Sequence, residues 1–157
     1  MLEIAEEKTK KEKITNVSFI HSSADNIPLE NNSVDAVLYI ASLHNIPGRE
    51  NRIKSLKEVK RILRKEGKAL ISVWSRTQDK FRESFRGKKF NTKKREFGDK
   101  NIYWRQDGLD VPRFYHHYGK EEFVKDLEEV GFNIASFKSV KIKSKKYDDN
   151  YFAIVRI

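Results

Sequence analysis

The sequence contains no cysteine among its 157 residues, so a disulfide framework and cysteine-bound zinc are both excluded. It has only three prolines and seven glycines, and the first glycine is Gly48. No apolar run approaches the ~18 residues that a membrane-spanning helix needs, and the N-terminus has no apolar signal core. From these absences we expect a cytoplasmic protein that makes no membrane contact.

The charge and the aromatic content indicate a folded domain with an anionic partner. The net charge is +10 and 36% of the residues are charged, yet 10 Phe, 6 Tyr and 2 Trp argue against disorder. The length fits a single domain over residues 1–157. A basic surplus of this size favours a polyanion such as nucleic acid, although a Lys/Glu-rich surface of the kind found in heat-loving organisms is an alternative.

Hydrophobic periodicity predicts alternating helices and strands. We expect helices over residues 1–13, 49–64 (ended by Gly67) and 119–129 (ended by Gly131), and strands over 17–20, 34–43, 68–74, 133–143 and 151–157. The nearly continuous apolar run from Val34 to Leu43 is typical of a strand buried on both faces of a sheet. This order predicts an α/β fold with a mostly parallel sheet and a closing antiparallel hairpin.

Residues 76–112 interrupt this rhythm as a basic, aromatic-rich insertion. Its composition is typical of a nucleic-acid contact surface, in which cations follow the phosphates and aromatic rings stack on bases. The alternative is a solvated loop whose Phe side chains pack locally. As a group, the predicted RNA contacts are Arg82, Arg86, Lys88, Lys89, Lys93, Lys94 and Arg95.

Four short motifs in order carry a family resemblance: 1-MLEIA-5, 24-ADNIPL-29, 33-SVDAVL-38 and 63-LRKEGKAL-70. Together they resemble the later part of a class I S-adenosylmethionine (SAM) methyltransferase, which implies a Rossmann-like α/β sheet and SAM as cofactor. The resemblance also implies an incomplete sheet, because the first strand, the Gly-rich turn and the second strand have no counterpart before residue 1. We therefore expect weakened cofactor binding, and a bare sheet edge that a homodimer or partner chain covers.

A narrower resemblance lies in 40-IASLHNI-46, 72-SVW-74 and 113-RFYHHY-118. These segments are similar to the tRNA wobble-uridine carboxymethyl methyltransferases, the group related to the methyltransferase half of the AlkB-homologue enzymes. That family methylates the carboxylate of 5-carboxymethyluridine, so the resemblance implies a tRNA partner and a role in tRNA modification. Two alternatives stay open: a methyltransferase acting on a small molecule or a protein, and a non-catalytic RNA-binding subunit that keeps the fold.

The resemblance also suggests site residues. It implies cofactor contacts from Ala24, Asp25, Asn26, Ile40 and Ala41, with the Asp25 carboxylate accepting a hydrogen bond from the adenine amine. A turn-forming or helix-capping Asp25 is the simpler alternative.

On the substrate side we expect Arg113, Tyr115, His116, Tyr118 and His44, because a guanidinium can hold a carboxylate bidentately and rings can stack on an exposed base. The alternatives are a structural histidine at position 44 and an aromatic core edge at 113–118. We predict no certain catalytic residue and no metal site, because the four histidines show no ligand spacing.

Overall fold

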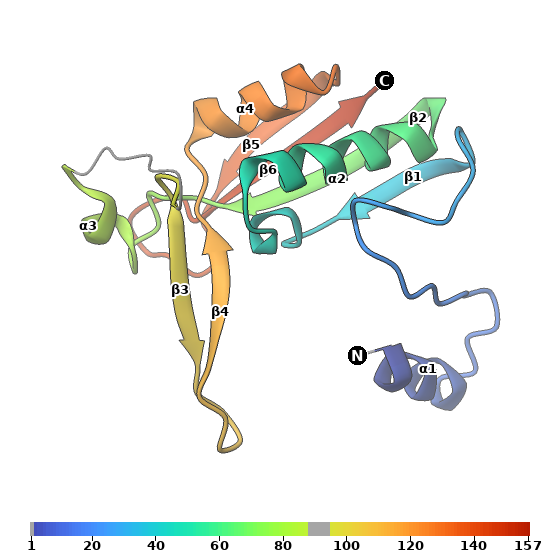
Figure 1. Ribbon diagram of the computed structural model, residues 1–157, viewed down its shortest axis with the longest axis horizontal. Coiled ribbons are helices and arrows are strands. Elements are labelled where there is room, and N and C mark those ends of the chain that lie inside the picture. The colour runs from blue at the N-terminus through green and yellow to red at the C-terminus, as the bar shows by residue number, and fades with distance from the viewer. Residues whose placement is uncertain (1, 88–94) are drawn as a thin grey trace.

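The computed structural model describes residues 2–87 and 95–157. Its elements in chain order are α1 (Leu2–Lys11), β1 (Val34–Tyr39), the 3-10 helix η1 (Leu43–Asn45), α2 (Arg49–Ile62), β2 (Leu63–Trp74), α3 (Arg82–Phe85), β3 (Asp99–Trp104), β4 (Val111–His116), α4 (Lys120–Glu129), β5 (Asn133–Val140) and β6 (Asn150–Arg156). Four strands form a central sheet of order β1-β2-β6-β5, and β3 and β4 form a separate hairpin that projects from it (Figure 1).

The sheet is mixed. β1 and β2 run parallel, with Leu38 opposite Leu70, whereas β6 runs antiparallel to both of its neighbours, β2 and β5. The α/β fold and the closing hairpin are therefore confirmed, but a mostly parallel sheet is wrong. Residues 141–149 join β5 to β6, and this connection is shorter than the crossover that a parallel pair needs, so the two strands run in opposite directions.

One face of the sheet is covered by α2 and α4 (Figure 1). Leu56 and Val59 from α2, and Phe123 and Leu127 from α4, are almost completely buried in one core with Ile71 of β2. These side chains recur at helical spacing along α2 and α4, so each helix presents an apolar stripe to the sheet. This packing fixes the ends of β1 and β2, where the candidate site lies.

Three details of the predicted elements are wrong. Residues 17–20 form no strand: Val17 is 47% exposed, and no described strand pairs with this segment. β1 is not buried on both faces, since Leu38 is 76% exposed. The helix ends at Ile62, and Gly67 lies inside β2, where an added Cβ would come within 2.7 Å of a side-chain carbon of Leu63.

The β3–β4 hairpin was not predicted. It lies largely within the basic 76–112 segment, and backbone hydrogen bonds anchor its base to the rest of the molecule. The amide of Tyr118 donates to the carbonyl of Trp74 (2.9 Å), and the amide of Arg76 donates to the carbonyl of Tyr118 (2.9 Å). The amide of His117 donates to the carbonyl of Gly98 (2.8 Å) and closes the base of the hairpin itself. Gly98 has φ +130°, and a Cβ there would lie 2.4 Å from the His117 carbonyl oxygen, so the position requires glycine.

Helix α1 lies apart from the sheet at the end of a long connecting segment and buries none of its residues (Figure 1). Within the described part of the chain, none of the helices combines the length and the apolar character needed to cross a bilayer.

Candidate active site

A cavity of about 420 Å³ lies beyond the carboxyl ends of β1 and β2. Ligands of open α/β sheets bind at this edge, because loops from neighbouring strands meet there. Three segments build the walls: the turn after β1, the last residue of β2, and the middle of β4. The lining residues are Ala41, His44, Asn45, Trp74, Arg113, Phe114 and Tyr115.

Stacked aromatic rings form one side of this cavity. The rings of Trp74 and Tyr115 lie nearly parallel, with centroids 4.7 Å apart and 8° between their planes. The His44 ring stacks on Trp74 at 4.9 Å. Such flat apolar faces suit a planar ligand such as a nucleobase.

His44 is almost fully buried and uncharged. Burial lowers the pKa of His44 to about 3, and the nearby His117 and His116 rings act in the same direction. Its Nδ1 accepts a hydrogen bond from the Trp74 amide (3.1 Å), so the proton of the neutral ring is on Nε2. His44 therefore shapes the cavity and holds the end of β2.

The His117 ring packs beside the rings of Trp74 and Tyr115 but does not line the cavity. Its ring contacts Phe81 at 4.9 Å and Phe85 at 5.3 Å, and neither ring nitrogen has a hydrogen-bond partner among the described residues. Burial lowers the pKa of His117 to about 4. Both buried histidines beside Trp74 are thus neutral at pH 7.

Arg113 places a positive charge at the cavity. Its side chain is exposed, and its guanidinium carbon lies 4.3 Å from the ring centroid of Trp104. In the described part of the chain, Arg113 has no ion pair with a carboxylate. The cavity thus combines an uncharged aromatic side with one cation able to bind a carboxylate or phosphate.

The turn after β1 brings backbone groups to the same edge. Ala41 has φ +51°, a conformation that few non-glycine residues adopt. Its amide donates to Ser72 Oγ (3.0 Å), and its carbonyl accepts from Asn45 Nδ2 (2.8 Å). Ile40, the residue before it, is 41% exposed. The two predicted cofactor contacts in this turn, Ile40 and Ala41, therefore lie at the carboxyl edge.

The other predicted cofactor residues, Ala24, Asp25 and Asn26, form a separate turn on the surface. The Ser23 hydroxyl donates to the Asp25 carboxylate, and the loop that follows is held to α2 through the Ile27 amide and Glu58 (2.8 Å). Burial raises the pKa of Tyr39, and the negative charge of Asp25 raises it further. The Asp25 carboxylate therefore lies near enough to Tyr39, the last residue of β1, for its charge to act on the Tyr39 hydroxyl.

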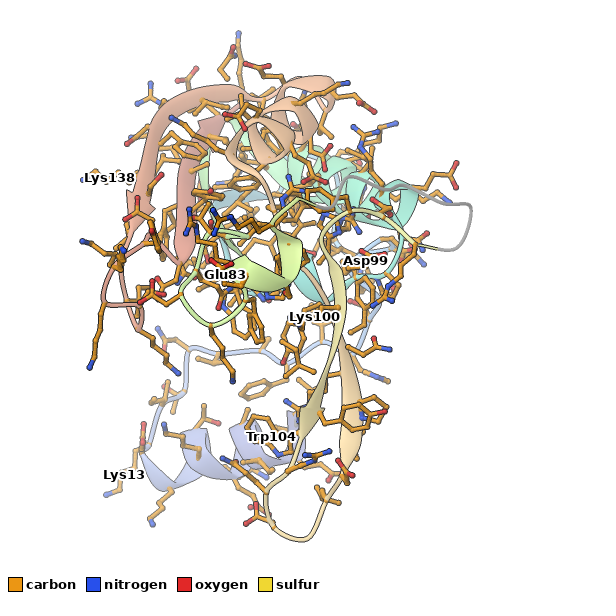
Figure 2. The ribbon with its side chains drawn as sticks, turned by 90° about the vertical axis from the view of Figure 1, so that its left-hand side faces the viewer. Lys13, Glu83, Asp99, Lys100, Trp104 and Lys138 are labelled. Carbon is orange, nitrogen blue, oxygen red and sulfur yellow. The ribbon has the colours of Figure 1, made fainter. Side chains whose placement is uncertain are left out.

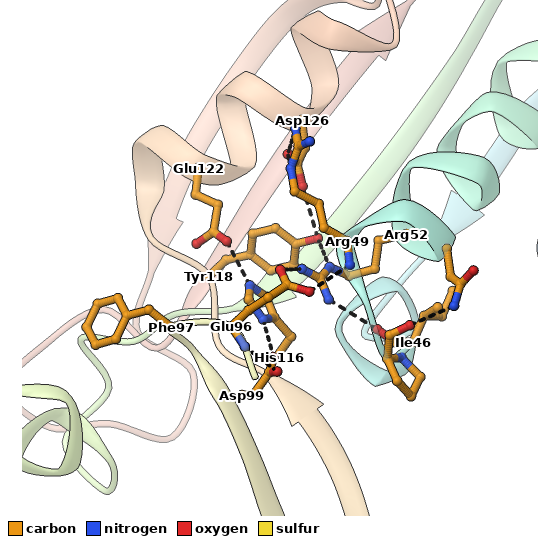
Figure 3. A network of polar contacts seen from close by, with 12 residues as sticks. Ile46, Arg49, Arg52, Glu96, Phe97, Asp99, His116, Tyr118, Glu122 and Asp126 are labelled. Atoms are coloured by element: carbon orange, nitrogen blue, oxygen red, sulfur yellow. Dashed lines mark hydrogen bonds and ion pairs between the residues drawn. The ribbon is translucent and has the colours of Figure 1, made fainter. Parts of the chain in front are cut away.

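The structure places His116 and Tyr118 away from the cavity, in a buried polar network (Figure 3). His116 Nδ1 hydrogen-bonds Asp99 (2.7 Å) and Nε2 hydrogen-bonds Glu122 (2.9 Å). Burial lowers the pKa of His116, but the two carboxylates outweigh it and raise the pKa above its ordinary value. His116 and Tyr118, expected beside the substrate, are internal side chains whose partners are already in the protein.

Arg52 of helix α2 joins Tyr118 and Glu96 of this network to the loop after η1 (Figure 3). Its side chain is fully buried; Nε donates to the Tyr118 hydroxyl (2.9 Å) and Nη2 donates to Glu96 (2.6 Å). Nη1 donates to the carbonyl of Ile46 (3.3 Å), in the loop that follows η1. One guanidinium therefore links α2, the η1 loop and the base of the hairpin.

Glu96, His116 and Glu122 bring ligand-type atoms within 4.8 Å of one another. Each is already engaged: Glu96 by Arg52, and Glu122 by His116 and Arg76 (2.9 Å). We therefore interpret the group as part of the structural network.

The predicted RNA contacts are only partly described. Arg86 is exposed beside Glu83 (3.6 Å), and the Arg82 guanidinium lies 4.1 Å from the ring centroid of Tyr147. Arg95 is exposed and its Nη2 donates to the carbonyl of Asp99 (3.5 Å). The remaining predicted contacts lie outside the described residues: Lys88, Lys89, Lys93 and Lys94.

Trp74, Asn45 and Phe114 line the cavity although the sequence analysis did not select them. Trp74 carried a usable signal, since it ends a predicted strand at the edge where ligands bind. Asn45 and Phe114 lie next to residues that were selected.

Comparison with known proteins gives a family signal in the first part of the chain. Residues 1–71 match the family "Methyltransferase domain". The ubiquinone/menaquinone biosynthesis C-methyltransferase UbiE of Campylobacter jejuni is 30% identical over 139 residues, covering 82% of this chain and 54% of that protein. The tRNA (carboxymethyluridine(34)-5-O)-methyltransferase ALKBH8 of Macaca fascicularis is 42% identical over 53 residues, which is 34% of this chain and 8% of that protein.

The fold agrees with this signal. A SAM-dependent methyltransferase from Clostridium acetobutylicum superposes with a TM-score of 0.73 at 17% identity, covering 99% of this chain and 70% of that structure. The chain spans about half the length of UbiE. Residues 1–71 therefore resemble a methyltransferase domain, and the chain has the α/β fold of known SAM-dependent methyltransferases; together these matches support SAM as the cofactor. The match to ALKBH8 is confined to a third of the chain, and UbiE matches more of it.

Proposed function

We propose that this chain forms the substrate-binding side of a SAM-dependent methyltransferase that acts on a carboxymethylated uridine of tRNA. The observation that carries the proposal is the cavity itself, where the Trp74–Tyr115 stack and the Arg113 guanidinium converge at the carboxyl edge of the sheet. A uridine ring suits the stack, and its carboxylate suits the guanidinium. The ALKBH8 match supports the same substrate class.

Methyl transfer to a carboxylate requires the protein to position that carboxylate, and it requires no proton transfer. A carboxylate is already a nucleophile, so no general base is needed, in agreement with a cavity whose histidine is neutral. Arg113 would orient the carboxylate, while Tyr115 and Trp74 would fix the plane of the base. SAM supplies the methyl group when bound, and Asp25, Ile40 and Ala41 would hold it. An exposed carboxylate at Asp25 and a rigid turn at Ala41 fit that role.

A small aromatic substrate is the second candidate, because the match to UbiE extends over 82% of the chain. A planar ring would occupy the same aromatic stack without RNA. The two candidates differ at Arg113: a carboxylate or phosphate needs its charge, whereas an uncharged ring does not.

The test measures binding of three probes to the purified chain. SAM is titrated by calorimetry. An anticodon stem-loop carrying 5-carboxymethyluridine, and its uridine counterpart, are titrated by fluorescence anisotropy. The variant is Arg113→Ala, and the matched control is Arg105→Ala, an exposed arginine of the same hairpin that pairs with Asp110 (3.0 Å).

We expect Arg113→Ala to weaken binding of the carboxymethylated stem-loop about 10- to 150-fold, the effect of losing one charge-assisted hydrogen-bonded pair. Arg105→Ala should change it less than threefold. Equal affinities in both variants and the parent, or no preference of the parent for the carboxymethylated stem-loop over its uridine counterpart, would contradict the proposal. Tight RNA binding without SAM binding would select the non-catalytic RNA-binding subunit.

A further inference from the structure

The two faces of the β3–β4 hairpin differ in chemistry. Cross-strand partners share a face and neighbours along a strand alternate, so the register Lys100–Tyr115, Ile102–Arg113 and Trp104–Val111 defines one face. We call this set the pocket face, because Arg113 and Tyr115 also line the cavity. Its members are Lys100, Ile102, Trp104, Val111, Arg113 and Tyr115.

The pocket face carries two cations and no carboxylate. Asp99 pairs with His116 on the opposite face, where it belongs to the buried network. Near the tip, Asp110 is paired with Arg105. Negative charge is thus kept off the pocket face by strand alternation and by pairing.

A continuous series of rings and cations runs from the cavity onto this face. Tyr115 stacks on Trp74 inside the cavity, and Arg113 comes next on the same face of the strand. The Arg113 guanidinium lies 4.3 Å from the Trp104 ring centroid, and Trp104 is 37% exposed. Figure 2 shows Lys100 near the base and Trp104 further along the hairpin, which projects away from the sheet in Figure 1.

We propose that the pocket face binds the nucleotides next to the one in the cavity, as an extended single strand. The inference rests on the proposed function, since it takes an RNA base to occupy the cavity. Tyr115 and Arg113 are successive residues on one face of β4, about 6.7 Å apart, and Trp104 lies diagonally across on β3 with its ring 4.3 Å from the Arg113 guanidinium. The three side chains therefore present a base platform, a phosphate contact and a second platform in order. Aromatic rings alternating with cations are the usual device for single-stranded nucleic acid.

A protein partner would also suit an exposed Trp, but the charges favour RNA. The chain has a net charge of +10, and the pocket face presents the exposed Arg113 without a carboxylate; its second cation, Lys100, donates to Ser84 Oγ (3.0 Å). Such a surface attracts phosphates and raises their association rate at moderate salt.

The experiment compares Trp104→Ala with Tyr103→Ala, the adjacent aromatic on the opposite face, which is 54% exposed. The probes are a labelled five-nucleotide oligouridylate, measured by anisotropy, and uridine monophosphate, measured by calorimetry. Trp104→Phe tests rescue by another ring. Size-exclusion chromatography of each variant records its oligomeric state.

We expect Trp104→Ala to weaken oligouridylate binding about 5- to 100-fold, with uridine monophosphate binding unchanged within twofold, because the mononucleotide reaches only the cavity. Tyr103→Ala should alter neither, and Trp104→Phe should keep most of the affinity. The two tryptophans are Trp74 and Trp104, so Trp104→Phe should remove the Trp104 share of the quenching by the oligonucleotide and leave only that of Trp74 in the cavity.

Four outcomes would overturn the inference. If the parent binds the oligonucleotide but Trp104→Ala binds it equally well, the hairpin proposal fails and the proposed function stands. If Trp104→Ala weakens both probes equally, the residue supports the cavity instead. If the parent forms a dimer that Trp104→Ala dissociates, the face is a protein contact. If the parent binds neither probe, the hairpin inference fails, and the proposed function is then decided by the carboxymethylated stem-loop alone.

Discussion

Replacement of Arg52 by alanine tests whether the buried network holds the hairpin and the helices together. The guanidinium is fully buried and donates to Tyr118, Glu96 and Ile46, groups that belong to different segments of the chain. Alanine removes all three bonds and leaves their acceptors without this donor. We expect a loss of stability well above that of an ordinary surface substitution.

The magnitude follows from burial. Removing one partner of a buried ion pair costs about 3–5 kcal/mol, because the other charge is left uncompensated. The Glu96 side chain is 26% exposed, so water can partly solvate its carboxylate after the change. We therefore expect the lower half of that range, about 3–4 kcal/mol, and a Tm lower by about 10 °C.

Urea unfolding followed by circular dichroism measures this change in the free energy of unfolding. Arg105→Ala is the surface control, because its ion pair with Asp110 is 72% and 61% exposed; it should cost less than about 0.5 kcal/mol. Tyr118→Phe, which removes only one acceptor of Arg52, should cost about 1–3 kcal/mol. The double variant should cost less than the sum of the two, because both remove the same bond. An Arg52→Ala loss below about 1 kcal/mol would refute the argument.

Two further predictions concern the hairpin base. The pKa values of Asp99 and Glu122 are lowered in the folded chain, so the stabilisation from these carboxylates is present above pH ~4 and is lost as pH falls. The pKa of His116 is raised, so the stabilisation from the charged imidazole is complete below pH ~6.5 and is lost as pH rises through the folded pKa of His116. The buried, neutral His44 and His117 lose their stabilisation as pH falls below ~6.5, because their folded pKa values are about 3 and about 4. Unfolding free energy should therefore peak near pH ~6.5, and His116→Gln should remove the decline above that pH; an unchanged profile would contradict this. Gly98→Ala should destabilise the chain by about 1–3 kcal/mol, because φ at this position is +130° and the new Cβ would meet the His117 carbonyl. Hydrogen exchange at the hairpin base should accelerate in this variant, and unaltered protection would count against the prediction.

The elements that were predictable are those with one clear period. Helix α2 has apolar residues at helical spacing, and β5 and β6 flank a polar turn, so their existence follows from the sequence. The β3–β4 hairpin has no such pattern, because large side chains occupy both faces. Tyr103 and Trp104 are adjacent, as are Phe114 and Tyr115, and this hides the period of two that marks a strand.

Part of the candidate site was predictable, from the strand end before His44 and from the family resemblance of residues 113–118. His44 and Arg113 were both expected at a substrate pocket, and the structure brings them to one cavity with Tyr115. His116 could not be separated from them without recognising β4 as a strand. Once 111–116 is a strand, alternation turns Arg113 and Tyr115 to one face and His116 to the other, where Asp99 and Glu122 enclose it.

Asp99 and His116 lie on the face of the hairpin opposite Arg113 and Tyr115, so their charges do not line the cavity. Among the described residues that line it, Arg113 alone carries a full charge, because His44 with a pKa of about 3 stays neutral. Asp99 and Glu122 are engaged in the network, and Asp110 is paired with Arg105. The cavity's affinity for an anion should therefore be constant between pH 6 and 8. A pH dependence of ligand binding in that range would have to arise from the ligand itself or from the stability of the hairpin base.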